Sequence, residues 1–142
     1  MNQKGFITCG LIVVVVLLVI IFLILTICNS KDCSQLVIDT YELHSGIDIP
    51  DVHFISCYYD EEKEVRISIY QLKTDINFYI DRHYFEFIKL SPDSVFQGFG
   101  MLHPDELPKN EGLYYIRGER WGRQWQYLVE KETERLWVEL SY

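Results

Sequence analysis

The sequence predicts an α+β protein in which one N-terminal transmembrane helix precedes one domain built on a largely antiparallel sheet. Residues 6–27 are almost all large and apolar. The rest of the chain alternates between helical and strand periodicity in the order α-β-β-α-β-β-β, which favours about five strands packed by one main helix. The expected parts are an N-terminal flank (1–5), a transmembrane helix (6–28), a tether (29–35) and a soluble α+β domain (36–142).

The N-terminal apolar run is long enough to cross a bilayer. No charged residue lies between Lys4 and Lys31, and about 22 helical residues rise about 33 Å, against a hydrocarbon core about 30 Å thick. An uncleaved anchor is the main expectation, because a signal peptide has a shorter apolar region and small residues at its cleavage site. Two alternatives stay open. They are cleavage after Ser30, and lipidation at Cys28, where residues 25–28 resemble a bacterial lipobox.

Charge predicts the side of the membrane and the class of partner. Lys4 and the α-amino group precede the apolar run, so the positive-inside rule places the domain on the non-cytoplasmic side, in the periplasm of a bacterium. Beyond Ser30 the chain has 12 basic and 21 acidic residues, a net charge of −9. That charge repels phosphate backbones. The expected partners are the membrane, through residues 6–28, and a protein; nucleic acid is not expected.

Beyond the expected transmembrane helix the chain has two cysteines, Cys33 and Cys57, that could form a disulfide. The bond would close a loop of about 24 residues and contribute about 3 kcal/mol in the chain-entropy model. Disulfides persist in oxidising compartments, which agrees with the expected location. The alternative is two unpaired cysteines, one of them buried in the sheet.

Local patterns predict the first half of the domain. A short helix is expected to begin at residue 36 and to end at Gly46, because glycine adopts the left-handed conformation that ends helices. Alternating apolar residues predict a β-hairpin over residues 52–69. Its polar face, which carries Arg66 and Ser68, is expected to be the wetter one.

The second half begins with apolar residues at three- and four-residue spacing. This pattern predicts an amphipathic helix of about four turns over residues 76–88, capped by Thr74 or Asp75. The irregular segment 91–112 is unusually long for a small domain, and part of it is expected to fold back on the sheet. Three strands follow, over residues 113–117, 123–130 and 135–141, with turns at 118–122 and 131–134.

The most suggestive candidate for a binding surface is the hairpin tip at residues 117–125, which contains three arginines and two tryptophans. Trp and Arg dominate the hot spots of protein–protein interfaces. The alternative, which is the commoner arrangement, is a charged turn with Trp125 in the core. The candidate partner-binding residues, from this tip and from the long segment, are Arg117, Arg120, Trp121, Arg123, Trp125, Phe99 and Met101.

No catalytic or metal-binding pattern is recognisable. The four histidines lie on separate predicted elements and have no ligand spacing. Carboxylate pairs such as Asp105 and Glu106 could act as acid and base only in a shaped pocket, and no nucleophile motif occurs. We therefore expect no enzyme activity, no metal and no cofactor.

The motif LHSGIDIP at residues 43–50, followed by the hairpin, an aromatic helix and a Trp-rich meander, resembles small uncharacterised membrane-anchored or lipidated bacterial α+β proteins. The resemblance covers residues 36–142 and implies no catalytic residues. Some proteins of this build are similar to immunity proteins that block toxins at the envelope.

The expected function is a single-pass envelope protein whose soluble domain binds another protein, as an immunity or inhibitor factor or as an accessory subunit. One alternative is a small-ligand-binding or sensing domain, which a deep pocket under segment 91–112 would mark. A hydrolase is the less favoured alternative.

Overall fold

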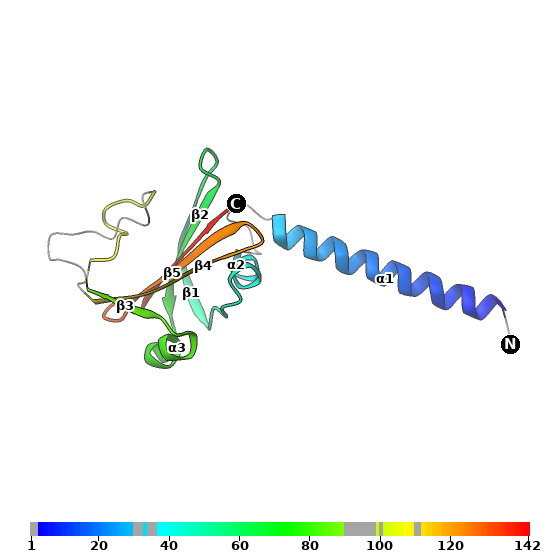
Figure 1. The fold of residues 1–142 in the computed structure, drawn as a ribbon, viewed down its shortest axis with the longest axis horizontal. Coiled ribbons are helices and arrows are strands. Elements are labelled where there is room, and N and C mark those ends of the chain that lie inside the picture. The colour runs from blue at the N-terminus through cyan, green and yellow to red at the C-terminus, as the bar shows by residue number, and fades with distance from the viewer. Residues whose placement is uncertain (1–2, 30–32, 34–36, 90–98, 100, 110–111) are drawn as a thin grey trace.

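A six-stranded antiparallel sheet forms the centre of the domain, with strand order β1-β2-β6-β5-β4-β3 (Figure 1). The computed structural model describes residues 3–29, 33, 37–89, 99, 101–109 and 112–142. The strands are β1 (Val52–Asp60), β2 (Val65–Leu72), β3 (Glu86–Lys89), β4 (Gly112–Arg120), β5 (Arg123–Glu130) and β6 (Arg135–Ser141). The helices are α1 (Gln3–Asn29), α2 (Val37–Ser45) and α3 (Ile76–His83).

The expected five strands in the order α-β-β-α-β-β-β are wrong, because the predicted four-turn helix is shorter and a strand follows it. Asp75 caps α3 by accepting from the backbone of Asn77, as one of the two expected caps. The helix ends at Tyr84, whose φ of 57° is left-handed. Residues 86–89 then pair with β4. Phe87 and Ile88 matched helical spacing, but the hydrogen bonds of this segment are those of an edge strand.

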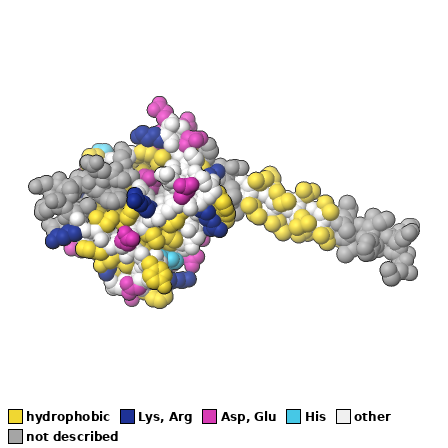
Figure 2. Space-filling model, viewed as in Figure 1, with side chains coloured by type: hydrophobic (Ala, Val, Ile, Leu, Met, Phe, Trp, Pro, Cys, Tyr) yellow, Lys and Arg dark blue, Asp and Glu magenta, His cyan; other side chains and the backbone are white. Residues whose placement is uncertain are grey.

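Helix α1 contains the apolar run. Its side chains are described over residues 12–26, which are apolar except for Thr26 and are exposed around the helix (Figure 2). Among the residues that the structure describes, no helix combines the length and the hydropathy needed to cross a membrane. The expectation of a transmembrane helix over 6–28 is therefore wrong for the described residues.

The helices cover one face of the sheet, which we call the helical face. Tyr41 of α2 and Ile80 of α3 pack there with Tyr127 of β5 and Val138 of β6 in one apolar cluster. Helix α2 ends before Gly46, whose φ of 73° confirms the expected left-handed stop. Two short helices thus share the role that the sequence assigned to one longer helix.

The described part of the long segment, residue 99 and residues 101–109, covers the opposite face. Phe99 and Leu102 are buried against Trp137 of β6 in a second apolar cluster. The Trp137 indole donates to the Glu106 carbonyl over 2.9 Å, and the Tyr58 hydroxyl donates to the Glu106 carboxylate over 2.6 Å. The expectation that part of this segment folds back on the sheet is confirmed for these residues; residues 90–98, 100 and 110–111 lie outside the described chain.

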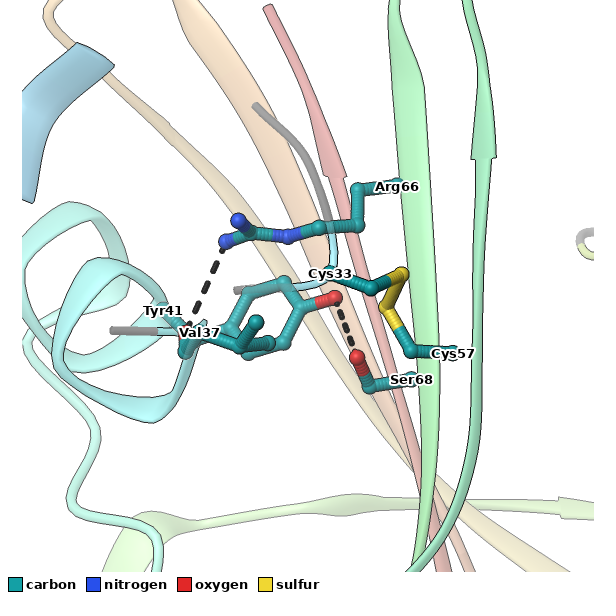
Figure 3. Close-up of a disulfide and its surroundings, with 6 residues drawn as sticks. All are labelled: Cys33, Val37, Tyr41, Cys57, Arg66 and Ser68. Atoms are coloured by element: carbon teal, nitrogen blue, oxygen red, sulfur yellow. Dashed lines mark hydrogen bonds between the residues drawn. A yellow bond between two sulfur atoms is a disulfide. The ribbon is translucent and has the colours of Figure 1, made fainter. Parts of the chain in front are cut away.

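Arg66 and Ser68 are fully buried, so the expectation of a wetter face on this hairpin is wrong. Helix α2 covers them (Figure 3). The Arg66 guanidinium lies 4.5 Å from the centre of the Tyr41 ring and donates to the Val37 carbonyl over 3.5 Å. The hydroxyl groups of Tyr41 and Ser68 share a hydrogen bond of 2.9 Å. Both faces of β2 are therefore packed.

A disulfide joins Cys33 to Cys57 of β1, with the two Cα atoms 5.9 Å apart (Figure 3). Of the two alternatives for these cysteines, the paired one is confirmed. The bond fixes the chain just before α2 to an outer strand of the sheet. Residues 30–32, 34 and 35 of the expected tether, and residue 36 of the expected domain, lie outside the described chain.

Removal of this disulfide is expected to lower the free energy of unfolding by about 2–4 kcal/mol, because it releases a loop that is closed in the unfolded chain. The test is urea denaturation of the full-length chain and of the double variant C33S/C57S, each with and without dithiothreitol. The reductant should shift the wild-type midpoint to that of the variant and leave the variant unchanged. A wild-type midpoint that is insensitive to reductant would contradict the expectation.

Candidate functional site

The tip of the β4–β5 hairpin has an unusual sequence for its geometry. Arg120 pairs with Arg123, so only Trp121 and Gly122 form the turn. Both turn residues have positive φ, 54° and 74°. Two-residue turns of this kind favour Asn-Gly, and a bulky side chain at positive φ is an outlier that costs about 1 kcal/mol or more. The positive φ at this position is therefore energetically unfavourable for a tryptophan.

The two arginines that flank the turn bind the end of α2. Arg120 donates from Nη1 to the Leu43 carbonyl over 3.1 Å. Arg123 lies with Nη1 2.8 Å from His44 Nε2, and its guanidinium lies 4.7 Å from the centre of the Tyr142 ring. Cations at a helix C-terminus satisfy free carbonyls and interact favourably with the helix dipole. These two arginines hold the hairpin tip against α2.

Trp121 itself is exposed and held in place. Its side chain is 61% exposed. The Arg120 guanidinium lies 4.4 Å from the indole centre, and the His44 ring meets the indole edge-on at 5.5 Å. We call Trp121, Arg120 and His44 the tip cluster. The cluster presents one large aromatic surface, the Trp121 indole. Its contacts with Arg120 and His44 already constrain the rotamer of this side chain.

The structure separates the other candidate residues from the tip cluster. Trp125 is partly buried on the helical face, edge-on to Tyr127, so the commoner arrangement holds for it. Phe99 is fully buried and Met101 packs beside it in the second apolar cluster. Arg117 points to the opposite face of the sheet from Arg120, because three residues along a strand reverse the side.

A cavity of about 440 Å³ lies where Arg117 points. Most of its lining residues lie on the face opposite the helices, along β4, β5 and β6. The cavity is lined by Tyr115, Arg117, Gly118, Glu119, Gln124, Trp125, Gln126 and Glu139. No residue of the described part of segment 91–112 lines it, so it is not the pocket that the ligand-binding alternative places under that segment.

A chain of hydrogen bonds crosses this cavity. Arg117, Gln126 and Glu139 stand opposite one another on three neighbouring strands. The Tyr115 hydroxyl donates to Gln126 Oε1 over 3.0 Å, and Gln126 Nε2 donates to Glu139 Oε1 over 2.8 Å. The amide of Gln126 is thereby fixed in one orientation, with its N–H groups towards the carboxyl.

The environment of Glu139 changes its protonation. Burial raises the pKa of this carboxyl to about 7, although the hydrogen bond from Gln126 lowers it in part. Burial also raises the pKa of the Tyr115 hydroxyl, against the opposing effect of Arg117. At neutral pH the cavity therefore contains a guanidinium, a neutral phenol and a carboxyl that is partly protonated.

Sequence reasoning did not single out Glu139, Gln126 or Tyr115. In the sequence, each of them is an ordinary residue at one of the alternating positions of a predicted strand. Only the register of the three strands brings the three side chains together. A charged residue between the apolar positions of a terminal strand was the one available signal. Among the described residues no group of His, Cys, Asp and Glu side chains could hold a metal ion.

Substitution of Gly118 by alanine is expected to destabilise the domain by about 1–3 kcal/mol, because the new methyl group overpacks the hairpin. A Cβ there would overlap the Trp125 indole, with Cε2 only 2.8 Å away. G112A is the matched control, since its nearest neighbour is the Phe87 ring at 3.3 Å and Phe87 is exposed. Urea denaturation should show a loss for G118A that exceeds the loss for G112A; equal losses would contradict the packing.

Glu139 is expected to make stability fall as pH rises. Its pKa is about 7 in the folded chain and 4.5 ordinarily. Between these values the unfolded chain releases the proton first, so rising pH favours unfolding by at most about 3 kcal/mol, and the loss is complete above about pH 7. E139Q removes the titration and should lose less stability than the wild type from about pH 5 to about pH 8.

The control for this pH dependence is E62Q, which removes the same charge from the exposed β1–β2 turn. E62Q should follow the wild-type curve of unfolding free energy against pH. An E139Q curve that also follows the wild type would show that this carboxyl titrates normally.

Comparisons of this chain with protein-family models, with curated proteins and with solved structures find no match. The resemblance of residues 43–50 and the following elements to anchored bacterial proteins therefore stays a prediction from the sequence.

Proposed function

We propose that the domain binds another protein through the tip cluster and has no catalytic role. The observation that carries this proposal is Trp121, an indole that is 61% exposed at a turn position with φ of 54°. Positions that conflict with backbone preference cluster at functional sites, where another requirement outweighs their cost. Exposed Trp beside Arg is the side-chain combination that dominates protein–protein hot spots.

Preorganisation supports the proposal. Contacts with Arg120 and His44 restrict the Trp121 side chain before any partner arrives. Restricted side chains lose less conformational entropy when a partner covers them. The hairpin tip also carries positive charge on a chain whose net charge is −8, which favours a partner surface that is acidic and aromatic.

The class of partner follows from the expected location. A disulfide between Cys33 and Cys57 supports folding in an oxidising compartment, such as the bacterial envelope. In that setting a small binding domain acts as an immunity or inhibitor factor, or as an accessory subunit of a larger complex. These roles need a stable surface and no chemistry.

The most direct variant is W121N. Alanine at Arg120, Trp121 and Arg123 together would also remove the contacts that hold the tip on α2, so a loss of binding would be ambiguous. Asn-Gly is the favoured sequence for a turn with two positive φ values. W121N should therefore keep the unfolding midpoint or raise it, while it weakens partner binding by about 2 kcal/mol or more, roughly 30-fold.

The partner is first identified by a photoreactive benzoylphenylalanine at position 121 of the full-length chain in the producing cells. The matched control is the same residue at position 78, because Phe78 on α3 is also 61% exposed. One crosslinked protein at position 121 and none at 78 is the expected result. The same products at both positions, or full binding by W121N, would reject the tip cluster as the interface.

A further inference from the structure

The cavity beside β6 has the features of a second, separate binding site. Its lining contains none of the tip-cluster residues, and most of its lining residues lie on the face of the sheet opposite α2. A volume of about 440 Å³ is within the range of small-molecule sites, which runs from about 300 to about 1,000 Å³. The cavity is large enough for an amino acid or a dipeptide and too small for a folded segment.

Charges of both signs line this cavity without neutralising each other. Arg117 stands on β4 and Glu139 on β6, with Gln126 of the intervening β5 between them. Strands lie about 4.8 Å apart, so the backbones of the two charged residues are about 10 Å apart. The Glu139 carboxyl accepts from Gln126 and forms no ion pair within the part of the chain that the structure describes.

Each simpler class of ligand meets an opposing charge. A purely cationic ligand that reaches Glu139 enters a cavity that also contains the Arg117 guanidinium. A purely anionic ligand at Arg117 meets Glu119 and Glu139. A molecule with separated charges of both signs satisfies both ends, and the hydroxyl of Tyr115 and the amides of Gln124 and Gln126 provide neutral hydrogen-bonding groups in the same cavity.

We propose that this cavity binds a small zwitterion, a free amino acid or a short peptide, with its ammonium group at Glu139 and its carboxylate at Arg117. An ammonium group binds the ionised form of a carboxyl, and a guanidinium binds a carboxylate through two parallel hydrogen bonds. Gln126 positions the Glu139 carboxyl through Nε2 and is itself fixed by the Tyr115 hydroxyl. The site thus binds both charged ends of one ligand.

Proton release gives this site a characteristic pH dependence. The groups that face Glu139 are Gln126 from β5, Tyr115, Arg117 and Glu119 from β4, and apolar Ile67 from β2. Because the pKa of Glu139 is about 7 in the free protein, the ligand must displace a proton at lower pH. Affinity should rise about tenfold per pH unit from about pH 5 to about pH 7 and level off above.

The test titrates the full-length chain by isothermal calorimetry with alanyl-alanine, N-acetyl-alanyl-alanine and alanyl-alanine amide. The dipeptide carries both charges, and each analogue lacks one. The dipeptide should bind at least tenfold more tightly than either analogue. E139Q should abolish the preference over the acetylated analogue, and R117Q the preference over the amide. E139Q keeps an acceptor for Gln126, so the cavity wall stays intact.

The matched control is again E62Q, which lowers the net negative charge equally at an exposed turn and should bind the dipeptide as the wild type does. Equal affinity for the dipeptide and its two analogues, or no heat with any of the three, would overturn the proposal. A preference for the dipeptide that survives in both E139Q and R117Q would also overturn it. W121N should bind the dipeptide normally, which separates this site from the tip cluster.

Discussion

The arrangement of the domain depends on polar contacts between α2 and the sheet. Tyr41 and Ser45 of α2 form hydrogen bonds of 2.9 Å and 2.8 Å with Ser68 and Tyr127, and the buried Arg66 guanidinium reaches the start of the same helix. A buried polar group that loses its partner costs about 1–3 kcal/mol. These contacts therefore allow one position of α2, where apolar packing alone would tolerate several.

The position of α2 in turn sets the position of the tip cluster. Arg120 and Arg123 bind the Leu43 carbonyl and the His44 ring, and both acceptors lie in the last turn of α2. Strand β2 therefore influences the position of the hairpin tip indirectly, because α2 contacts both of them. The buried arginine, the helix and the exposed indole form one continuous set of contacts.

Features that depend on neighbouring residues could be predicted from the sequence. The helix stop at Gly46 and the cap at Asp75 are local, and each has a physical reason within a few residues. The expected turn at 118–122 is wrong, because β4 extends to Arg120 and only Trp121 and Gly122 form the turn. The strand after Tyr84 could not be predicted, because a left-handed tyrosine and pairing with β4 are decided by tertiary contacts. The burial of Arg66 likewise depends on a helix that lies about 25 residues earlier in the chain.

The candidate site was predicted by composition and only partly by position. Three arginines and two tryptophans indicated the hairpin, but strand alternation divides them between two faces. Trp121 and Arg120 stay together, whereas Arg117 joins a cavity with Gln126 and Glu139. That cavity exists because three strands are aligned in one register, and a shift of one residue would turn its polar groups to the helical face.

The disulfide also determines how the chain carries mechanical force. Cys33 follows α1 closely in the sequence, and its bond to Cys57 makes residues 34–56 a closed loop. Suppose that α1 is pulled while the rest of the sheet is held. The force then passes from Cys33 through the sulfur atoms into β1. Helix α2 lies inside the loop and off this load path. Tension on the N-terminal helix therefore reaches the sheet without passing along the backbone of α2, the helix that contacts the hairpin tip.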